Sequence, residues 1–222
     1  MIYILIAIDG ACKRNGDPTC SSSGVAWIET EDGDLLFKAK FETCSTSQRG
    51  EVNGLLEALH YAVDNASKDE DIIIITDSEY LYNTVTLNWV GKWQANNWMG
   101  AMGKVKNSDL WDTAWKYLSK LNTPNERVFM QWTKGHLLHY TTGNVKKAMI
   151  ADPTGIELFT RISSVANRPA ERTRLINEFN RERAEHDKES PPGEIALAWV
   201  IANTTADGLA SYIVQVMDNL MV

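Results

Sequence analysis

Runs of apolar residues alternate with turn-forming residues along the chain, and they predict five strands. The runs cover residues 2–8, 24–29, 35–42, 71–76 and 128–133. Four consecutive isoleucines at 72–75 are typical of a strand buried on both faces. A loop rich in Gly, Pro and Ser separates the first two runs, and the turn EDGD separates the second from the third. The sheet therefore begins with three consecutive strands.

Helical spacing of apolar residues separates the later strands. From about Glu51, one helix face is formed by Val52, Leu55, Leu56, Leu59 and Val63. Further helices are predicted at 78–90 and at 108–121, the second with Ser108 as its N-cap. Three strands followed by alternating helices and strands predict an α/β domain with a mixed sheet.

The pattern changes after Asp152. Pro153 suits the first turn of a helix that Asp152 caps, and residues 168–190 have the pattern of a highly charged helix. The break SPPG and a last apolar helical stripe follow. We expect one domain at 1–165 and a helical C-terminal extension at 166–222. The extension is expected to pack on the domain, and the alternative is a contact with a second copy or another protein.

Composition places the chain among globular proteins. Of its 222 residues, 44% are hydrophobic and 23% are charged. The three cysteines lack the spacing of metal ligands, which favours reduced thiols in the cytoplasm. The N-terminus lacks the basic segment of a signal peptide, and the apolar run at 195–202 is too short to span a bilayer. We expect a cytoplasmic monomer that does not enter a membrane.

The net charge of −7 is unevenly distributed. Residues 85–150 carry 9 Lys and Arg against 3 Asp and Glu, a local balance of +6, whereas the segments on either side are acidic. The same middle segment holds six of the eight tryptophans. Basic and aromatic residues interleaved in this way suit a phosphate backbone with stacked bases. A solvated face above core tryptophans is the alternative.

Three carboxylates occupy positions that bring them together. Asp9 follows the first apolar run, and Asp77 follows the fourth. Parallel neighbouring strands present such residues at one edge of the sheet. Glu51 lies in the first turn of the helix between them. Three acids without a neighbouring Lys or Arg repel one another, and a hard divalent cation such as Mg²⁺ or Mn²⁺ relieves the repulsion. For each acid taken alone, a turn, a cap or the solvated surface is the better explanation, and it is the combination of the three that favours a metal site.

Seven short motifs occur in one order over residues 1 to about 160. They are IDGAC (8–12), GVAW (24–27), SQRGEVNGLLEAL (47–59), TDSEY (76–80), WVGKWQANNW (89–98), KNSDLW (106–111) and WTKGH (132–136). Their order and spacing resemble type 1 ribonuclease H, the bacterial-like enzyme that cuts the RNA strand of an RNA–DNA hybrid. The resemblance implies the ribonuclease H-like fold, with helices on both sides of a mixed five-stranded sheet.

The resemblance also implies a catalytic site. Asp9, Glu51 and Asp77 match three of the family's four metal-binding acids, which hold two Mg²⁺ ions, with Mn²⁺ as a substitute. Cleavage in the family leaves 5′-phosphate and 3′-hydroxyl ends. His136 matches the family's mobile histidine, which moves protons or assists product release. His136 as an ordinary surface residue is the alternative, because His139 lies close by.

The fourth acid departs from the family pattern. Relatives place an Asp soon after a GN motif, at the start of the last helix, but here Ala148 occupies the expected position. Asp152 follows four residues later, about one helical turn, and is our choice for the catalytic and metal-binding acid. Glu157 is the alternative.

Substrate contacts carry over by motif. Thr46 and Asn107 resemble the family's pocket for a phosphate of the DNA strand. The residues that match contacts to the RNA 2′-hydroxyls and bases are Cys12, Ser47, Gln48 and Glu79. Trp89 and Trp93 resemble residues that line the channel for the DNA strand. The basic handle of the bacterial enzyme is reduced here to Lys104 and Lys106, which predicts weaker hybrid binding that salt disrupts more easily.

Two other functions fit the same fold. A hybrid-binding module without catalysis has no reason to keep a repulsive group of acids, and the chain retains Asp9, Glu51, Asp77 and His136. A DNA nuclease related to resolvases or integrases is disfavoured by TDSEY and KNSDLW. We expect a ribonuclease H that removes RNA primers or hybrids during DNA replication, in the host cytoplasm if its origin is viral.

Overall fold

The centre of the protein is a five-stranded sheet in the order β3-β2-β1-β4-β7. The computed structural model describes residues 3–17, 19–123 and 125–220, so residue 2 of the predicted first strand lies outside it. The strands are β1 (Tyr3–Lys13), β2 (Ser21–Glu29), β3 (Leu35–Thr43), β4 (Asp71–Thr76) and β7 (Val128–Trp132). β2 is antiparallel to β1 and β3, whereas β4 is parallel to β1 and β7. The predicted mixed five-stranded sheet is confirmed.

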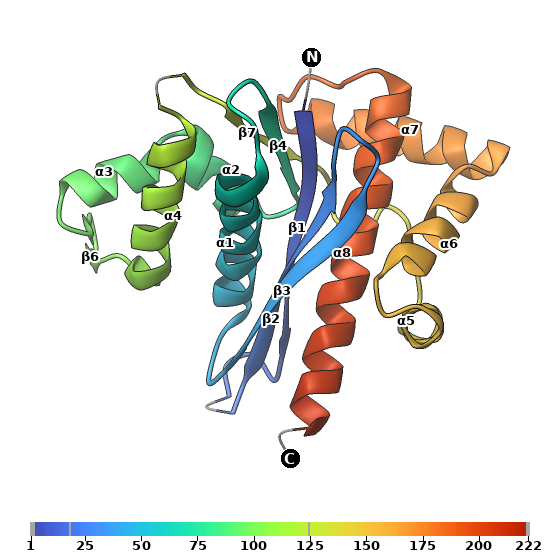
Figure 1. Cartoon of the computed structure of the whole chain (residues 1–222), viewed down its shortest axis with the longest axis horizontal. Helices are drawn as coiled ribbons and strands as arrows, with labels where there is room; N and C mark the ends of the chain where they lie inside the picture. The colour runs from blue at the N-terminus through green and yellow to red at the C-terminus, as the bar shows by residue number, and fades with distance from the viewer. Residues whose placement is uncertain (1–2, 18, 124, 221–222) are drawn as a thin grey trace.

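Helices cover both faces of this sheet (Figure 1). One face carries α1 (Ser47–Asn65), α2 (Glu79–Thr86), α3 (Trp89–Ala95) and α4 (Ser108–Leu121). The other carries α5 (Thr142–Ala151), α6 (Ile156–Ala166), α7 (Pro169–Glu185) and α8 (Gly193–Leu220). A two-stranded hairpin, β5 (Met99–Gly100) and β6 (Gly103–Lys104), lies between α3 and α4 in the chain.

Local geometry explains where these elements depart from the expected ranges. The helix predicted at 78–90 is two helices, because Asn88 has a φ of 50° and caps α3 by accepting a hydrogen bond from the Gly91 N–H. β1 runs five residues past its predicted end, since its antiparallel pairing with β2 continues to Lys13 opposite Ser21. The charged helix predicted at 168–190 is α7, which ends at Glu185.

Strand alternation divides the apolar residues between two cores. Ile4, Ile6 and Ile8 of β1 pack with α1 and α4, whereas Leu5 and Ala7 pack with α8. The isoleucines of β4 divide in the same way, which explains why both strands are almost continuously apolar.

Helix α8 belongs to the second of these cores. Its buried Ala206 and Leu209 lie in one apolar cluster with Val25 and Trp27 of β2. The Ser23 hydroxyl donates a hydrogen bond to the Ala210 carbonyl at 2.6 Å. Near the end of α8, Asp218 accepts from Lys13, Arg14 and Ser21. The division of the chain at 165/166 stays a prediction, and residues on both sides of it share this core. No helix in the described residues has the length and apolarity needed to cross a membrane.

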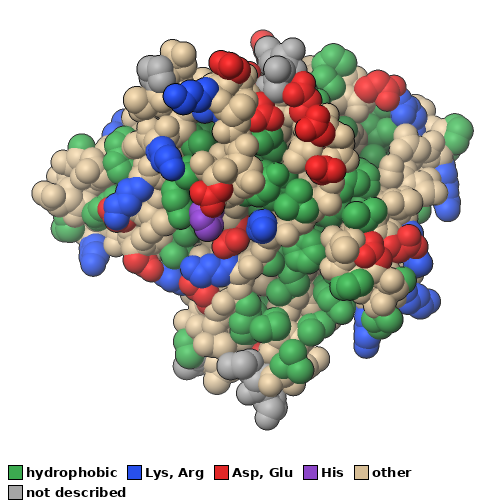
Figure 2. Space-filling view, in the orientation of Figure 1, with side chains coloured by type: hydrophobic (Ala, Val, Ile, Leu, Met, Phe, Trp, Pro, Cys, Tyr) green, Lys and Arg blue, Asp and Glu red, His purple; other side chains and the backbone are tan. Residues whose placement is uncertain are grey.

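One face of the molecule exposes part of its apolar surface. Figure 2 shows hydrophobic side chains gathered over β3 and along α8. β3 is the edge strand there, and its apolar side chains are only half-buried.

Helix α1 approaches β1 and β2 so closely that side chains are excluded between them. A Cβ on Gly10 of β1 would lie 2.2 Å from the Glu51 nitrogen. A Cβ on Gly24 of β2 would lie 2.3 Å from both the Gly50 oxygen and the Gly54 nitrogen. Glycine at these positions therefore fixes the helix directly against the strands.

We expect Gly24→Ala to lower the free energy of unfolding by roughly 3 kcal/mol, because the added methyl group must push backbone away from backbone. Gly143→Ala is the matched control, since Gly143 lies in α5 with no atom within 4 Å of its added Cβ. That control should be neutral or more stable by up to about 1 kcal/mol. Urea unfolding measures both, and a Gly24→Ala variant as stable as the parent would contradict the close-approach argument.

Candidate active site

Two acids of the site come from neighbouring parallel strands. β1 and β4 pair in register, with Ala7 opposite Ile75. Asp9 and Asp77 each lie two residues further on, so both carboxylates occupy the same edge of the sheet. Asp9 is only 7% exposed. The register of the sheet therefore confirms the prediction that the ends of these two strands lie at one edge.

Glu51 reaches the same place from α1. Its backbone nitrogen lies against Gly10, the residue after Asp9. Oxygen atoms of Asp9, Glu51 and Asp77 all lie within 4.8 Å of one another. We refer to these three residues as the acidic triad.

A fourth acid, Asp207 of α8, faces the triad. Its negative charge acts on Asp9, Glu51 and Asp77 and raises the pKa of each. The hydroxyl contact at Ala210 and the ion pairs at Asp218 hold α8 on the sheet on the C-terminal side of this acid. Four elements distant in sequence thus contribute carboxylates to one site.

Burial and mutual repulsion together make it unfavourable for all three carboxylates of the triad to be ionised. Burial raises the pKa of Asp9 well above its usual range, and the charges of Glu51 and Asp77 raise it further. Burial, followed by the charges of Asp77 and Asp207, raises the pKa of Glu51 to about 8. Burial also raises the pKa of Asp77, although the nearby His136 opposes this shift. A cation is the natural counterpart for such a group.

The donor set fits a divalent metal ion. The Oε2 atom of Glu51 is buried and has no hydrogen-bond partner among the described residues. A buried carboxylate oxygen without a partner is unfavourable unless a cation binds it. Ligands that are all carboxylate oxygens suit hard divalent ions rather than Zn²⁺. The triad therefore has the chemistry of a divalent-metal site.

The loop after β7 closes over Asp77. A Cβ on Gly135 would lie 2.1 Å from the Asp77 Oδ2 atom, so only glycine fits there without moving the carboxylate. His136 follows with a φ of 59°, and its Nδ1 lies 3.3 Å from an Asp207 oxygen. The His136 side chain is 76% exposed. An exposed imidazole thus lies at the entrance of the acidic site.

The structure does not bring Asp152 or Glu157 to the triad. Asp152 ends α5, and its oxygens accept hydrogen bonds from Thr154 and from the Glu157 N–H. The Glu157 carboxylate pairs with Arg161 at 2.7 Å. Both acids stabilise the start of α6, and the fourth acid whose charge acts on the triad is Asp207 of α8.

Sequence reasoning missed Asp207 because 70 residues separate it from His136 in the chain. One signal was available. Asp207 is the only charged residue between Glu194 and Asp218, within the apolar pattern of the last helix. A lone acid in such a helix is costly to bury without a partner, which makes it a candidate for a site.

Comparison with known proteins identifies the family. The family model for RNase H matches residues 2–152 of this chain. The chain belongs to the ribonuclease H family. The match ends before α7 and α8, so Asp207 lies outside it.

Ribonuclease H sequences from several bacteria are similar over most of their length. The ribonuclease H of Caldicellulosiruptor saccharolyticus is 34% identical over 137 residues, which are 61% of this chain and 86% of that protein. The ribonuclease H of Rickettsia bellii is 33% identical over 159 residues, which are 70% of this chain and 92% of that protein. The crystal structure of LC9-RNase H1, a type 1 RNase H with the type 2 active-site motif, aligns with a TM-score of 0.52 at 19% identity, covering 78% of this chain and 85% of that one. The predicted ribonuclease H-like fold is confirmed.

Membership of the ribonuclease H family makes this protein a hydrolase of nucleic acid. The acidic triad supplies the metal-binding site that such an enzyme requires. A divalent metal is therefore part of the active protein, as the sequence predicted.

Four of the predicted substrate residues lie around one cleft. The cleft has a volume of about 440 Å³ and is lined by Asn15, Thr46, Ser47, Gln48, Lys106 and Asn107. Thr46 caps α1 by accepting from the Arg49 N–H, and Asn107 is the N-cap residue of α4. Arg49 joins the two helices through Asp109 at 3.0 Å. The cleft thus lies where the N-termini of α1 and α4 meet.

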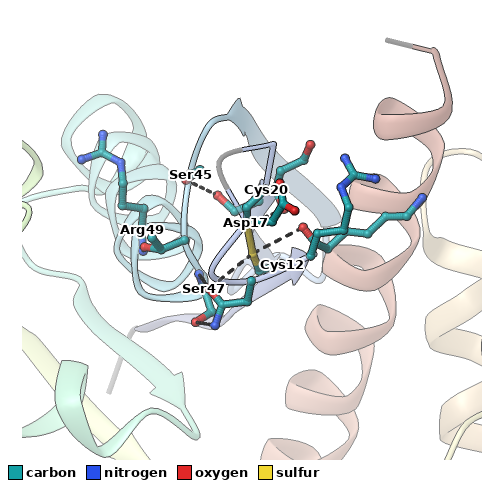
Figure 3. The surroundings of a disulfide bond; sticks show 12 residues. Cys12, Asp17, Cys20, Ser45, Ser47 and Arg49 are labelled. Carbon is teal, nitrogen blue, oxygen red and sulfur yellow. Dashed lines mark hydrogen bonds between the residues drawn. A yellow bond between two sulfur atoms is a disulfide. The ribbon is translucent and has the colours of Figure 1, made fainter. Parts of the chain in front are cut away.

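Cys12 is bonded to Cys20 rather than being a reduced thiol (Figure 3). The bond joins the end of β1 to the residue before β2, and Ser47 of α1 lies beside it. Asn15, in the loop that the bond closes, donates a hydrogen bond to the Ser47 hydroxyl at 3.2 Å. The expectation that all three cysteines are reduced is therefore wrong for this pair, and Cys44 is the free, exposed cysteine. Cys12 reaches the cleft region as part of a disulfide.

The remaining predicted substrate residues lie on α2 and α3. Glu79 begins α2, two residues after Asp77, and its side chain is 52% exposed. Trp89 and Trp93 are neighbours on α3, with ring centroids 6.2 Å apart. Trp93 also packs edge-on against Trp111 of α4 at 6.0 Å. The roles of these residues in substrate binding stay predictions.

We expect the metal-free protein to lose stability as the pH rises from about 5 to 8. The pKa of Glu51 is higher in the folded protein than in the unfolded chain, so the folded state binds more protons over this range. In EDTA at pH 8, Glu51→Gln should therefore raise the free energy of unfolding by roughly 1–3 kcal/mol. Glu57→Gln, further along α1, is the control and should change little. Equal pH profiles for the parent and Glu51→Gln would contradict this account.

Proposed function

We propose that this protein is an endonuclease that hydrolyses the RNA strand of RNA–DNA hybrids. The observation that carries the proposal is the meeting of three carboxylates from β1, α1 and β4, one of which has a buried oxygen without a hydrogen-bond partner among the described residues. The charge of Asp207 of α8 acts on all three. The similarity to proteins named ribonuclease H supports an RNA–DNA hybrid as the proposed substrate. Products with 5′-phosphate and 3′-hydroxyl ends are part of the proposal.

Asp9, Glu51, Asp77 and Asp207 would hold two Mg²⁺ ions, for which Mn²⁺ is a substitute. When bound, a pair of such ions activates water and stabilises the leaving oxygen of a phosphodiester. The carboxylates place negative charge where this pair of cations is needed. Because α1 and α8 are fixed on the sheet, the four acids are held in position before metal or substrate arrives.

His136 is proposed to move a proton at the site. Its Nδ1 contacts Asp207, which orients the ring and leaves the exposed Nε2 for exchange with solvent or the leaving group. The left-handed backbone at His136 and the glycine before it support a loop shaped for this position.

The hybrid is proposed to lie across the acidic site and the polar cleft. Thr46, Asn107 and Lys106 would bind a phosphate of the DNA strand. Ser47, Gln48 and Glu79 would contact the 2′-hydroxyls and base edges of the RNA strand, which distinguish RNA from DNA. Trp89 and Trp93 would line the channel for the DNA strand. We propose that such cleavage removes RNA primers or hybrids during DNA replication in the cytoplasm.

A hybrid with a fluorescent RNA strand tests this function directly. We expect cleavage in the presence of Mg²⁺ or Mn²⁺ and none in EDTA, because ionised carboxylates alone do not activate water. Duplex DNA of the same sequence should remain intact. Tight binding without cleavage would indicate a binding module, and cleavage of duplex DNA would indicate a nuclease of the resolvase or integrase kind.

Paired variants decide the fourth acid within the same assay. Asp207→Asn should lower the rate of Mg²⁺-dependent cleavage by about two orders of magnitude or more, since it removes a charged ligand from the site. Asp152→Asn is the matched control and should retain a rate within about threefold of the parent, because its carboxylate only caps α6. The opposite ranking would return the role to Asp152.

Salt dependence tests the DNA-strand contact. We expect hybrid binding to be weaker than in a relative with a strongly basic handle, so that the complex dissociates at a lower salt concentration. Because fewer phosphates are contacted, the slope of log affinity against log salt should also be smaller than in that relative. Lys106→Ala should reduce the slope of log affinity against log salt by about 0.9, the loss of one phosphate contact. Lys116→Ala is the control, because Lys116 pairs with Asp112 on α4 outside the cleft. An unchanged slope for Lys106→Ala would remove Lys106 from the binding surface.

A further inference from the structure

Residues 133–192, between β7 and α8, reach back to the rim of the acidic site. Helix α7 lies in this segment and extends toward the sheet beside β4 and β7 (Figure 1). His186 follows directly after α7, and its Nδ1 lies 2.8 Å from the Glu79 Oε1 atom. Glu79 in turn lies two residues beyond Asp77. A side chain from this segment therefore holds a residue at the edge of the site.

The end of α7 is firmly anchored. Arg183 is only 5% exposed, and its Nε donates a hydrogen bond to the Glu189 carbonyl at 2.7 Å. Its Nη1 donates to the Trp132 carbonyl. The guanidinium also lies over the rings of Phe179 and Trp199, at 5.6 and 5.5 Å. A buried guanidinium with carbonyl acceptors and aromatic faces fixes the backbone that leads to His186.

Trp132 connects this anchor to the catalytic acids. The His186 ring lies 4.5 Å from the Trp132 ring, and Lys188 lies over the same indole at 5.0 Å. On its other side, the Trp132 Nε1 donates a hydrogen bond to the Asp77 carbonyl at 3.1 Å. His186 is therefore held at a fixed position relative to Asp77.

Glu79 depends on His186 for its orientation. The Glu79 side chain is half-exposed, and His186 is its ion-pair partner in the part of the chain that the structure describes. A glutamate without a partner samples many rotamers, and binding must then select one. When its proton is on Nδ1, the imidazole can donate a hydrogen bond to the Glu79 carboxylate.

We propose that His186 is a positioning residue for substrate recognition, which holds the Glu79 carboxylate ready to accept hydrogen bonds from the RNA strand of a bound hybrid. The donors are 2′-hydroxyls or the amino group that guanine presents in the minor groove. The inference rests on the proposed function. It assigns the segment between β7 and α8 a part in recognising the substrate.

Kinetics of three single variants test the inference. His186→Ala should raise KM for the hybrid roughly five- to tenfold, the worth of one hydrogen bond, with kcat nearly unchanged. His186→Asn should restore most of the lost affinity, because the asparagine amide places a donor near the position of Nδ1. His60→Ala is the matched control, since His60 is an exposed histidine of α1 that pairs with Asp64 at 3.2 Å.

A double variant separates positioning from a general structural role. Because His186 acts through Glu79, the variant with both His186→Ala and Glu79→Ala should have the KM of Glu79→Ala alone. A further rise in KM in the double variant, or a fall in kcat together with a lower melting temperature in His186→Ala, would overturn the inference. If His186→Ala has the same KM as the parent protein, the inference about His186 is overturned. The proposed function would still stand in that case, provided that the parent protein cleaves the hybrid. Failure of the parent to cleave hybrid would overturn both.

Discussion

Helix α1 lies so close to β1 and β2 that Gly10 and Gly24 have no space for a side chain, and this approach sets the position of Glu51. The backbone nitrogen of Glu51 rests on Gly10, so its carboxylate is brought to Asp9 without any adjustment of side chains. The parallel register of β1 and β4 adds Asp77, and the docking of α8 adds Asp207. Rigid packing of backbone against backbone therefore holds together carboxylates that repel one another.

The folded protein tolerates the repulsion among the acids because the packing around them does not depend on the acids. Apolar residues on both faces of β1 and β4 hold the sheet between two layers of helices. Ion pairs at Asp218 and a hydroxyl contact at Ala210 secure α8 on the sheet without using the Asp207 carboxylate. The acids can therefore remain a site of high negative potential, which a divalent cation relieves and a phosphodiester then approaches.

The sequence predicts the parts of the site that follow local rules. Apolar runs ending in Asp9 and Asp77, with a helix beginning near Glu51, lead to the sheet edge and to the triad. The split of the predicted helix at Asn88 was not foreseen, because a left-handed residue other than glycine leaves little trace in a pattern. The pairing of Cys12 with Cys20 and the contact of His186 with Glu79 are tertiary, and no local spacing reports them. Asp207 was missed for the same reason, since the position of α8 is set by its packing on β2 and not by the motif that precedes it.

The connection between β7 and α8 spans about 60 residues, and this length has little energetic consequence for the site. Even as a fully flexible loop, a connection of 60 residues would cost only roughly 1.6 kcal/mol more to close than one of 10, since loop entropy grows with the logarithm of length. The packing of the apolar face of α8 determines the position of Asp207, whatever the length of the chain between β7 and α8. Such a junction tolerates the gain or loss of whole helices, because neither change alters the packing that places Asp207.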